Sequence, residues 1–358
     1  MSTVSNPSVS SNVARMGKDQ AVLQLLRPLD RFLEAPEVTE LSICRPGEVW
    51  TKTFTGWQVH EVPELTDKFL QALITAIIVY NGIAPRSVNY VVLPGGQRGT
   101  IAQSPAVIDG TLSFVIRKHS LVVKTLEQLD AEGAFDGYTD VSFNKPTEDE
   151  ANRYLDVHDF TRLEPFEVEL LKLKRDGTIR EFLEKCVLYK RNIIIAGKTG
   201  SGKTTFARSL IEKVPGEERI ITIEDVHELF LPNHPNRVHM LYGYGAGRVS
   251  AEECLAACMR QSPDRIFLAE LRGHEAWEYL NSLNTGHPGS ITTTHANNAL
   301  QTFERVASLI RNSEIGRQLD MEAIKRVLYT TIDVVLFFRD RKLVEVFYDP
   351  IFAKSKMA

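Results

Sequence analysis

The sequence predicts an α/β carboxy-terminal domain built around a phosphate-binding loop, preceded by a smaller α+β domain and a long linker. Strand patterns alternate with helical patterns in the second half of the chain, which is typical of a largely parallel sheet. Short strands separated by turn signals fill much of the first third, which is typical of an antiparallel sheet. We place a disordered amino terminus at 1–17, the α+β domain at 18–124, the linker at 125–163 and the phosphate-loop domain at 164–358.

The bulk composition is that of a globular protein of two domains. The 358 residues are 43% hydrophobic and 25% charged, and the net charge of -4 gives no global reason to expect a nucleic-acid coat or an anionic-membrane binder. Four cysteines without a C-x-x-C pair indicate a reducing, cytoplasmic compartment. No apolar run approaches the ~18–20 residues that span a bilayer, so we expect any membrane association to be peripheral.

The strongest motif lies within Asn192–Thr205. Three apolar residues, Ile193 to Ile195, predict a buried strand, and the eight residues Gly197–Thr204 match G-x-x-x-x-G-K-[ST]. In this motif Lys203 contacts the β- and γ-phosphates, and the hydroxyl of Thr204 ligates Mg²⁺. We therefore expect nucleotide contacts from Gly197, Lys198, Thr199, Gly200, Ser201, Gly202, Lys203, Thr204 and Thr205.

A helix over 204–213 is predicted to follow the loop and to point its positive amino-terminal end at the phosphates. A second helix, from Ser250 to Met259, opens with a capping box in which Ser250 precedes Glu253 by three residues. The strands of this domain are predicted at Ile193–Ala196, Arg219–Ile223, Arg265–Ala269, Ser290–Thr294 and, as the last strand of the main sheet, Asp333–Phe338.

The first domain is predicted to begin with a helix, Asp19–Leu33, that Pro28 kinks. Its other elements are strands at Glu40–Cys44 and Val49–Phe54, a turn at Gly56-Trp57, a helix at Thr66–Tyr80 that ends at Asn81-Gly82, and strands between Val88 and Arg117 with a hairpin signal at Asp109-Gly110.

Polar residues follow the predicted strands of the second domain. Glu224 and Asp225 follow one strand, Glu270 another and His295 a third. Because ligands bind at the carboxyl ends of the strands in an open α/β sheet, we expect these side chains near the phosphate loop. Together they offer a magnesium site at Thr204 and Glu270, a carboxylate that acts on water and a polar contact to the γ-phosphate. Each also fits a structural role, since Glu224 and Asp225 alone fit a solvated turn and His295 alone fits a hydrogen-bonded loop position.

Four motifs occur in a fixed order along the chain: GKTGSGKT, TIED with Glu228, LAELRG, and TGHPGS followed by THAN. This set resembles the secretion ATPase superfamily, which powers type II secretion, type IV pili and type IV secretion. The residues of the last two motifs are most similar to those of the VirB-eleven branch, the traffic ATPases of type IV secretion and plasmid conjugation. The resemblance extends over nearly the whole chain, because VTELSICRPGEVW and GGQRGT also look like that family's amino-terminal domain.

The resemblance implies a RecA-like phosphate-loop domain in a homohexameric ring, with ATP and Mg²⁺ bound between the two domains of each subunit. ATP hydrolysis would drive substrate translocation or pilus assembly at the cytoplasmic face of the inner membrane. The implied partners are inner-membrane channel components and other secretion ATPases. Peripheral membrane contact and direct nucleic-acid binding stay open, as does the kind of cargo.

The resemblance also assigns roles to single residues. Lys203 and Thr204 hold phosphates and Mg²⁺, Glu270 and Glu224 are the catalytic carboxylates, and His295 and His287 line the γ-phosphate side. Two residues of the first domain, Arg98 and Arg117, approach the phosphates. Relatives often carry an arginine where this chain has Ser262, so an arginine that reaches a neighbouring subunit is either Arg260 or Arg272.

Two other classes of function stay open at this point. A RecA-like DNA translocase or helicase shares the phosphate loop and the ring, and single-stranded DNA would stimulate its hydrolysis in a salt-dependent way. A nucleotide-gated regulatory scaffold would bind ATP with little turnover.

Overall fold

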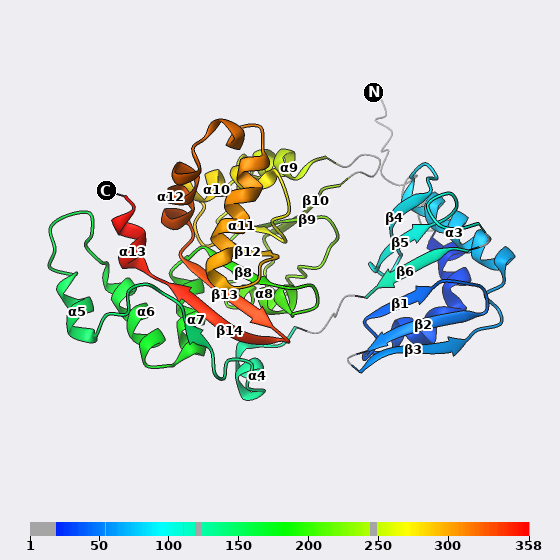
Figure 1. Cartoon of the computed structure of the whole chain (residues 1–358), viewed down its shortest axis with the longest axis horizontal. Helices are drawn as coiled ribbons and strands as arrows, with labels where there is room; N and C mark the ends of the chain where they lie inside the picture. The colour runs from blue at the N-terminus through cyan, green and yellow to red at the C-terminus, as the bar shows by residue number, and fades with distance from the viewer. Residues whose placement is uncertain (1–18, 54, 110, 119–122, 244–248, 358) are drawn as a thin grey trace, which may run out of the picture. The chain divides into compact units, whose positions relative to one another are not determined.

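The computed structural model describes residues 19–53, 55–109, 111–118, 123–243 and 249–357 (Figure 1). The described residues up to 118 form one compact unit and those from 123 onward a second. The predicted disordered stretch 1–17 and the predicted turn residue 110 lie outside the described residues. None of the helices that the structure describes is long and apolar enough to cross a bilayer.

The first unit is a six-stranded antiparallel sheet with the strand order β3-β2-β1-β6-β5-β4. Apolar side chains from one face of the sheet and from its helices form a single core. The strands are β1 (Glu40–Ile43), β2 (Glu48–Thr53), β3 (Gly56–Glu61), β4 (Val88–Val92), β5 (Arg98–Ala102) and β6 (Ser113–Arg117). The helical segments are residues 19–26, η1 (Arg27–Leu29), α2 (Asp30–Glu34) and α3 (Asp67–Asn81).

The predicted boundaries of the helix Thr66–Tyr80 are confirmed by the caps of α3. Thr66 accepts a hydrogen bond from the Phe69 N–H at the start of α3, and Gly82 ends the helix in the left-handed conformation with φ 63°. Pro28 lies in η1, which interrupts the first helix, because proline removes a backbone donor. The predicted turn at Gly56-Trp57 is wrong, since β3 begins at Gly56. This edge strand is largely exposed and lacks the apolar alternation of a half-buried strand.

The second unit has a mainly parallel sheet in two hydrogen-bonded parts, β10-β9-β11 and β12-β8-β13-β14-β7. The parts meet directly after β11, where the Leu271 N–H donates to the Thr293 carbonyl at 2.8 Å. The strands are β7 (Thr139–Asp140), β8 (Ile193–Gly197), β9 (Ile220–Glu224), β10 (Arg237–Leu241), β11 (Arg265–Leu268), β12 (Ile291–Thr294), β13 (Val334–Arg339) and β14 (Lys342–Tyr348).

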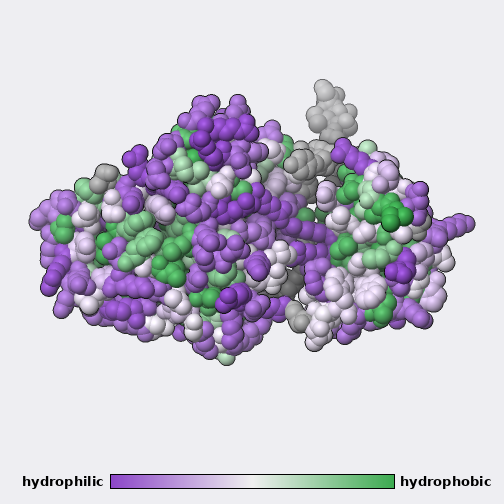
Figure 2. All heavy atoms as spheres, in the orientation of Figure 1, coloured by the Kyte–Doolittle hydropathy of each residue, from purple (hydrophilic) through white to green (hydrophobic). Residues whose placement is uncertain are grey.

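Helices cover both faces of this sheet, so its central strands are buried on both sides. On β8, Ile193 and Ile195 pack into one core while Ile194 and Ala196 pack into the other, which explains the continuous apolar run in the sequence. One face carries α6 (Pro165–Arg175), α7 (Ile179–Leu188) and α8 (Lys203–Ile211), and the other carries α9 (Ala251–Cys258), α10 (Glu275–Asn284), α11 (Ala299–Asn312) and α12 (Met321–Thr331), with α13 (Pro350–Ser355) at the carboxyl end. Hydrophilic residues cover much of the surface around α12 in Figure 2, as expected for a helix whose apolar side faces the core.

The main sheet continues beyond the predicted last strand. Strand β14 pairs antiparallel with β13 and is followed in the sheet by β7. The tight turn between β13 and β14 contains two non-glycine residues with positive φ, Asp340 at 50° and Arg341 at 64°. Its sequence offers no glycine or proline, which is why the hairpin was not predicted.

Residues 125–163, predicted as a linker, are part of the second unit. They contain α4 (Leu126–Ala131), β7 and α5 (Glu148–Arg153). Leu126, Phe135 and Leu163 are buried in the core beneath α7 and α8, and the rings of Phe135 and Phe206 lie 6.0 Å apart. The few apolar residues of this acidic segment follow no helical or strand period, so the pattern alone indicates a loop.

The packing of this segment makes a testable prediction about stability. Phe135 is 3% exposed and Phe160 is 55% exposed, although both belong to 125–163. We expect Phe135→Ala to lower the free energy of unfolding of the second unit by about 3 kcal/mol, because it leaves a cavity in the core. Urea unfolding followed by circular dichroism measures the change, with Phe160→Ala as the matched control. Equal stability of the two variants would contradict the packed segment.

Candidate nucleotide-binding site

The strand register brings the carboxyl ends of β8, β9, β11 and β12 to the same edge of the sheet. In β8 and β12, Ala196 pairs with Thr294 in a parallel register. Strands β9 and β11 are likewise parallel, and residues 269–271 continue from β11 alongside β12. The phosphate loop, Glu224, Glu270 and His295 each follow one of these strand ends.

The phosphate loop has a backbone that depends on glycine at two positions. Gly197 has φ +152°, and a Cβ there would lie 2.3 Å from the Phe338 carbonyl oxygen and 2.6 Å from the Ser201 hydroxyl. Gly202 has φ +94° and precedes α8, with no side chain that caps the helix. The N–H groups of the first turn, where Thr204 and Thr205 lie, therefore remain available to an anion.

The lysine of the motif lies inside the loop. The Lys203 ammonium donates to the carbonyl oxygens of Gly197 at 2.9 Å and Lys198 at 3.0 Å, and the residue is 7% exposed. The turn between β13 and β14 also holds the loop, because the Arg341 N–H donates to the Ser201 carbonyl at 3.2 Å. A buried positive charge beside the first turn of α8 is suited to phosphate oxygens.

Glu270 and His295 form a pair beside this loop. His295 Nε2 lies 2.8 Å from Glu270 Oε1, and the two atoms form a hydrogen bond when Nε2 carries the proton. Without that proton, Glu270 Oε1 is buried and has no hydrogen-bond donor among the described residues. Burial lowers the pKa of His295, the positive charge of Lys203 lowers it further, and the carboxylate of Glu270 opposes both. His295 also hydrogen-bonds to the backbone of Gly197. Both side chains are therefore at the phosphate loop, as the sequence predicts.

Arg272 joins Glu270 to the end of β9. One of its terminal nitrogens lies 2.6 Å from Asp225 Oδ2, and the other lies 2.7 Å from Glu270 Oε2. Burial lowers the pKa of Arg272, but the hydrogen bond to Glu270 and the charge of Asp225 outweigh it and raise the pKa. The sequence leaves Arg272 open as an arginine that reaches a neighbouring subunit. The structure engages it within its own chain instead.

The predicted catalytic residue Glu224 belongs to a separate network. It is fully buried, and its Oε2 accepts hydrogen bonds from the N–H groups of Glu228 at 2.6 Å and Leu229 at 2.7 Å. Burial raises the pKa of Glu224, yet hydrogen bonds from His227, His239, Thr222 and the Glu228 backbone bring it well below its ordinary range. These contacts anchor the loop after β9, and none of them is made to Lys203, Glu270 or His295.

The structure does not place His287 beside the phosphate loop of its own chain. His287 precedes β12, whereas His295 follows it. The Gly289 N–H donates to Asn192 Oδ1 at 2.9 Å, and Asn192 lies just before β8. His287 is thus at the amino-terminal edge of the sheet, opposite the phosphate loop. The two histidines share a motif but lie at opposite ends of one strand.

Arg98 and Arg117 are direct neighbours in the first unit. They pair across β5 and β6, and Arg117 also pairs with Glu40 on β1. Two like charges directly opposite each other weaken a sheet. Such a pair of guanidinium groups is suited to an anionic ligand.

A mainly parallel, doubly covered sheet with a phosphate loop and the Glu270–His295 pair at one edge defines a RecA-like domain of the phosphate-loop class. The family model described as "Type II/IV secretion system protein" matches residues 161–339. The chain is 40% identical over 340 residues to the type IV secretion system protein VirB11 of Brucella suis, an alignment that covers 91% of this chain and 89% of the relative. The corresponding protein of Bartonella quintana is 38% identical over 339 residues, with 92% and 93% covered. The chain belongs to the VirB11 family of type IV secretion ATPases.

Solved structures agree with this assignment. The crystal structure of the VirB11 ATPase of Brucella suis in complex with sulphate has a TM-score of 0.53 and 38% sequence identity, covering 96% of this chain and 99% of that one. The pilus retraction motor PilT with bound ADP has a TM-score of 0.58 at 18% identity, covers 93% and 86%, and supports the fold alone.

Family membership confirms the predicted class of function. The chain is a nucleotide-binding ATPase that drives type IV secretion. This decides against the two alternatives that the sequence left open, a DNA helicase or translocase and a scaffold without turnover. The roles of single residues follow below as proposals.

The bridge made by Arg272 predicts a specific loss of activity. Arg272→Lys keeps the positive charge but cannot bind Asp225 and Glu270 as a planar fork. We expect kcat to fall by roughly tenfold or more, because Glu270 loses its fixed orientation. Steady-state ATP hydrolysis measures this, and Arg305→Lys on the exposed face of α11 is the control. An unchanged kcat for Arg272→Lys would show that the bridge has no part in positioning Glu270.

Proposed function

We propose that this chain is a hexameric motor that hydrolyses magnesium-bound ATP and transmits the resulting movement to a type IV secretion or conjugation channel. The observation that carries the proposal is the position of the Glu270–His295 pair: its two side chains lie 2.8 Å apart, and His295 directly follows Thr294, which pairs with Ala196 at the start of the phosphate loop. This arrangement combines a phosphate site with a carboxylate and an imidazole at the position where the γ-phosphate is expected.

The residues at the sheet edge fit a magnesium ion. Mg²⁺ prefers oxygen ligands, and the Thr204 hydroxyl and the Glu270 carboxylate provide them beside the loop. A bound Mg²⁺ supplies charge neutralisation for the phosphate oxygens. Lys203 binds the phosphates, Glu270 orients water or accepts its proton, and His295 lines the γ-phosphate side.

The first unit contributes Arg98 and Arg117 to the same nucleotide in this proposal. Their adjacent guanidinium groups offer planar, two-point donors to phosphate oxygens. Arg260 is exposed, whereas Arg272 binds Asp225 and Glu270 within its own chain. We therefore propose that Arg260 is the arginine that contacts a neighbouring subunit.

The hexamer, the partners and the location extend the family assignment. We infer a homohexamer that works at the cytoplasmic face of the inner membrane as a peripheral component. Its partners are inner-membrane components of the type IV secretion channel and other secretion ATPases. The names of the Brucella and Bartonella relatives as type IV secretion system proteins support this inference.

Removal of the charge or of the carboxylate tests the nucleotide site. We expect Lys203→Gln and Glu270→Gln each to lower ATP turnover by about 100-fold or more, because one loses the phosphate contact and the other the group that acts on water. Glu270→Gln should still bind a fluorescent ATP analogue, which separates chemistry from binding. Glu314→Gln, at an exposed carboxylate, is the control. Appreciable hydrolysis by both site variants would refute the proposed site.

A second prediction concerns the contribution of the first unit. Arg98→Gln and Arg117→Gln each remove a charged hydrogen bond to phosphate worth about 2 kcal/mol, so kcat/KM for ATP should fall by roughly thirtyfold. Arg45→Gln is the matched control, because Arg45 belongs to the same unit and its side chain is 68% exposed. If the two variants and the control hydrolyse ATP equally well, the arginines do not contact the nucleotide.

A further inference from the structure

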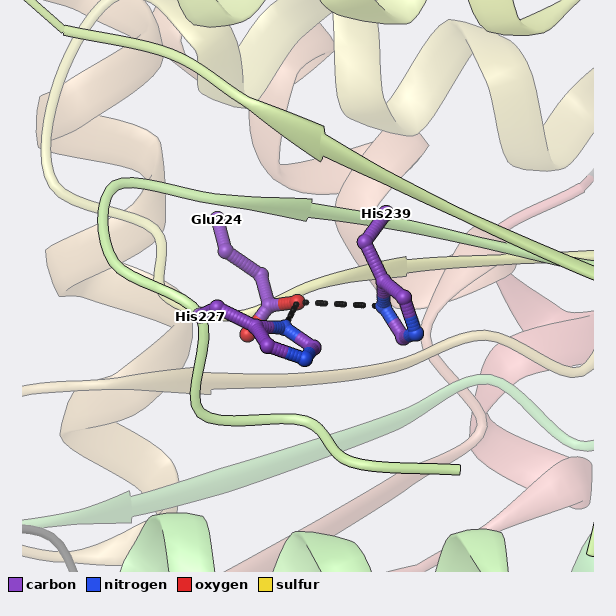
Figure 3. A group of neighbouring side chains, drawn as sticks. All are labelled: Glu224, His227 and His239. Atoms are coloured by element: carbon purple, nitrogen blue, oxygen red, sulfur yellow. Dashed lines mark hydrogen bonds and ion pairs between the residues drawn. The ribbon is translucent and has the colours of Figure 1, made fainter. Parts of the chain in front are cut away.

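The loop after β9 holds a cluster of side chains to which the proposed function above assigns no role. Glu224, His227 and His239 bring one ligand atom each to within 4.8 Å of one another, and they are the one such group of histidine, cysteine and acidic side chains in the described part of the chain. Figure 3 shows one carboxylate oxygen of Glu224 facing both imidazole rings. We propose that these three residues bind a zinc ion, at a site separate from the magnesium site of the nucleotide.

The backbone fixes the cluster from three directions. Glu224 ends β9, His227 lies in the loop that follows, and His239 lies on the neighbouring parallel strand β10, where it pairs with Thr222. Because residues two apart on a strand share a face, Thr222 and Glu224 point to the same side of the sheet. The ligands therefore converge without any rearrangement of the main chain.

The distances match the edges of a tetrahedral zinc site. The Nδ1 atoms of His227 and His239 lie 3.2 and 3.5 Å from Glu224 Oε1. A zinc ion bound at 2.0–2.1 Å by tetrahedral ligands separates them by about 3.3 Å. The longer of the two contacts is beyond the usual range of an N–H···O hydrogen bond. Small rotations of the imidazole rings complete the site.

The chemistry of the ligands selects zinc over magnesium. Two imidazole nitrogens and one carboxylate suit Zn²⁺, whereas Mg²⁺ requires oxygen ligands and keeps its water. Two backbone N–H groups donate to Oε2 of Glu224, an arrangement that favours the charged carboxylate. Each imidazole binds the ion through Nδ1 when its proton is on Nε2, and the fourth position is left to solvent.

A second layer of contacts orients the carboxylate. Oε2 of Glu224 is bound by two backbone N–H groups, so Oε1 is the oxygen directed at the histidines. The Thr222 hydroxyl lies 2.7 Å from both Glu224 Oε1 and His239 Nδ1. The hydrogen bond that Thr222 donates to Oε1 orients the carboxylate, and the contact of Thr222 with His239 Nδ1 is given up when that nitrogen binds the ion. The side chains of His227 and His239 are 33% and 22% exposed, which gives an ion access from solvent.

A bound ion would stabilise the loop that also carries Asp225. Asp225 follows Glu224 directly and bonds to Arg272, which in turn holds Glu270. Zinc would thus tie His227 to β9 and β10 and fix the starting point of this bridge. The ion is expected to raise the unfolding temperature, because it binds the folded state alone.

The test uses the full-length protein, stripped of metal with EDTA and kept free of nucleotide in millimolar Mg²⁺. Zn²⁺ is titrated in competition with a chromophoric chelator, and Co²⁺ is bound as a spectroscopic probe of tetrahedral coordination. We expect one Zn²⁺ per chain, visible Co²⁺ bands and a higher unfolding temperature. His227→Asn and His239→Asn should each weaken Zn²⁺ binding by roughly tenfold or more, and the double variant should lose the Co²⁺ bands.

Two matched variants separate this site from others. His158→Asn removes an exposed histidine outside the cluster and should bind Zn²⁺ like the parent. Glu270→Gln should also retain Zn²⁺, because the nucleotide site is separate. The proposal is overturned if the parent binds no stoichiometric Zn²⁺, if excess Mg²⁺ displaces it, if the folded double variant binds it equally, or if Glu270→Gln abolishes it.

Discussion

The parallel register between β8 and its neighbours is the constraint on which the catalytic edge depends. Ala196 pairs with Thr294, and Leu271 is hydrogen-bonded to Thr293. These pairings place the loop after β8 beside the residues that follow β11 and β12. A shift of one residue in any of these strands would turn its side chains to the opposite face of the sheet. Glu270 and His295 would then no longer meet beside Lys203.

Buried strands of the second unit could be predicted from the sequence almost to the residue. Strands β8 and β11 are covered on both faces, so they appear as continuous apolar runs between polar ends. Strands β3 and β10 are largely exposed or half-buried and carry mixed side chains, so periodicity does not reveal them. The segment 125–163 fails for a related reason, since isolated residues such as Phe135 pack into a core that other elements build.

The candidate site, like the fold, could be predicted only in part from the sequence. Local motifs predicted the phosphate loop and the Glu270–His295 pair, because each feature adjoins a buried strand. The sequence alone did not show that only one of His287 and His295 lies beside the phosphate loop. The two histidines flank β12, whose four residues extend over about 13 Å, so they lie at opposite ends of this strand. The fork of Arg272 depends on the distance between two strand ends, and the histidines around Glu224 depend on the pairing of β10 with β9.

The end of β9 serves two networks through adjacent residues. Glu224 accepts hydrogen bonds from the loop and faces two histidines, while Asp225 binds Arg272 and so reaches Glu270. Neighbouring residues at a strand end point in opposite directions, so one short segment can take part in both networks. Because Glu224 and Asp225 are adjacent in the chain, a change that moves the loop around Glu224 also moves Asp225. The orientation of Glu270 at the phosphate loop therefore depends on how firmly the loop after β9 is held.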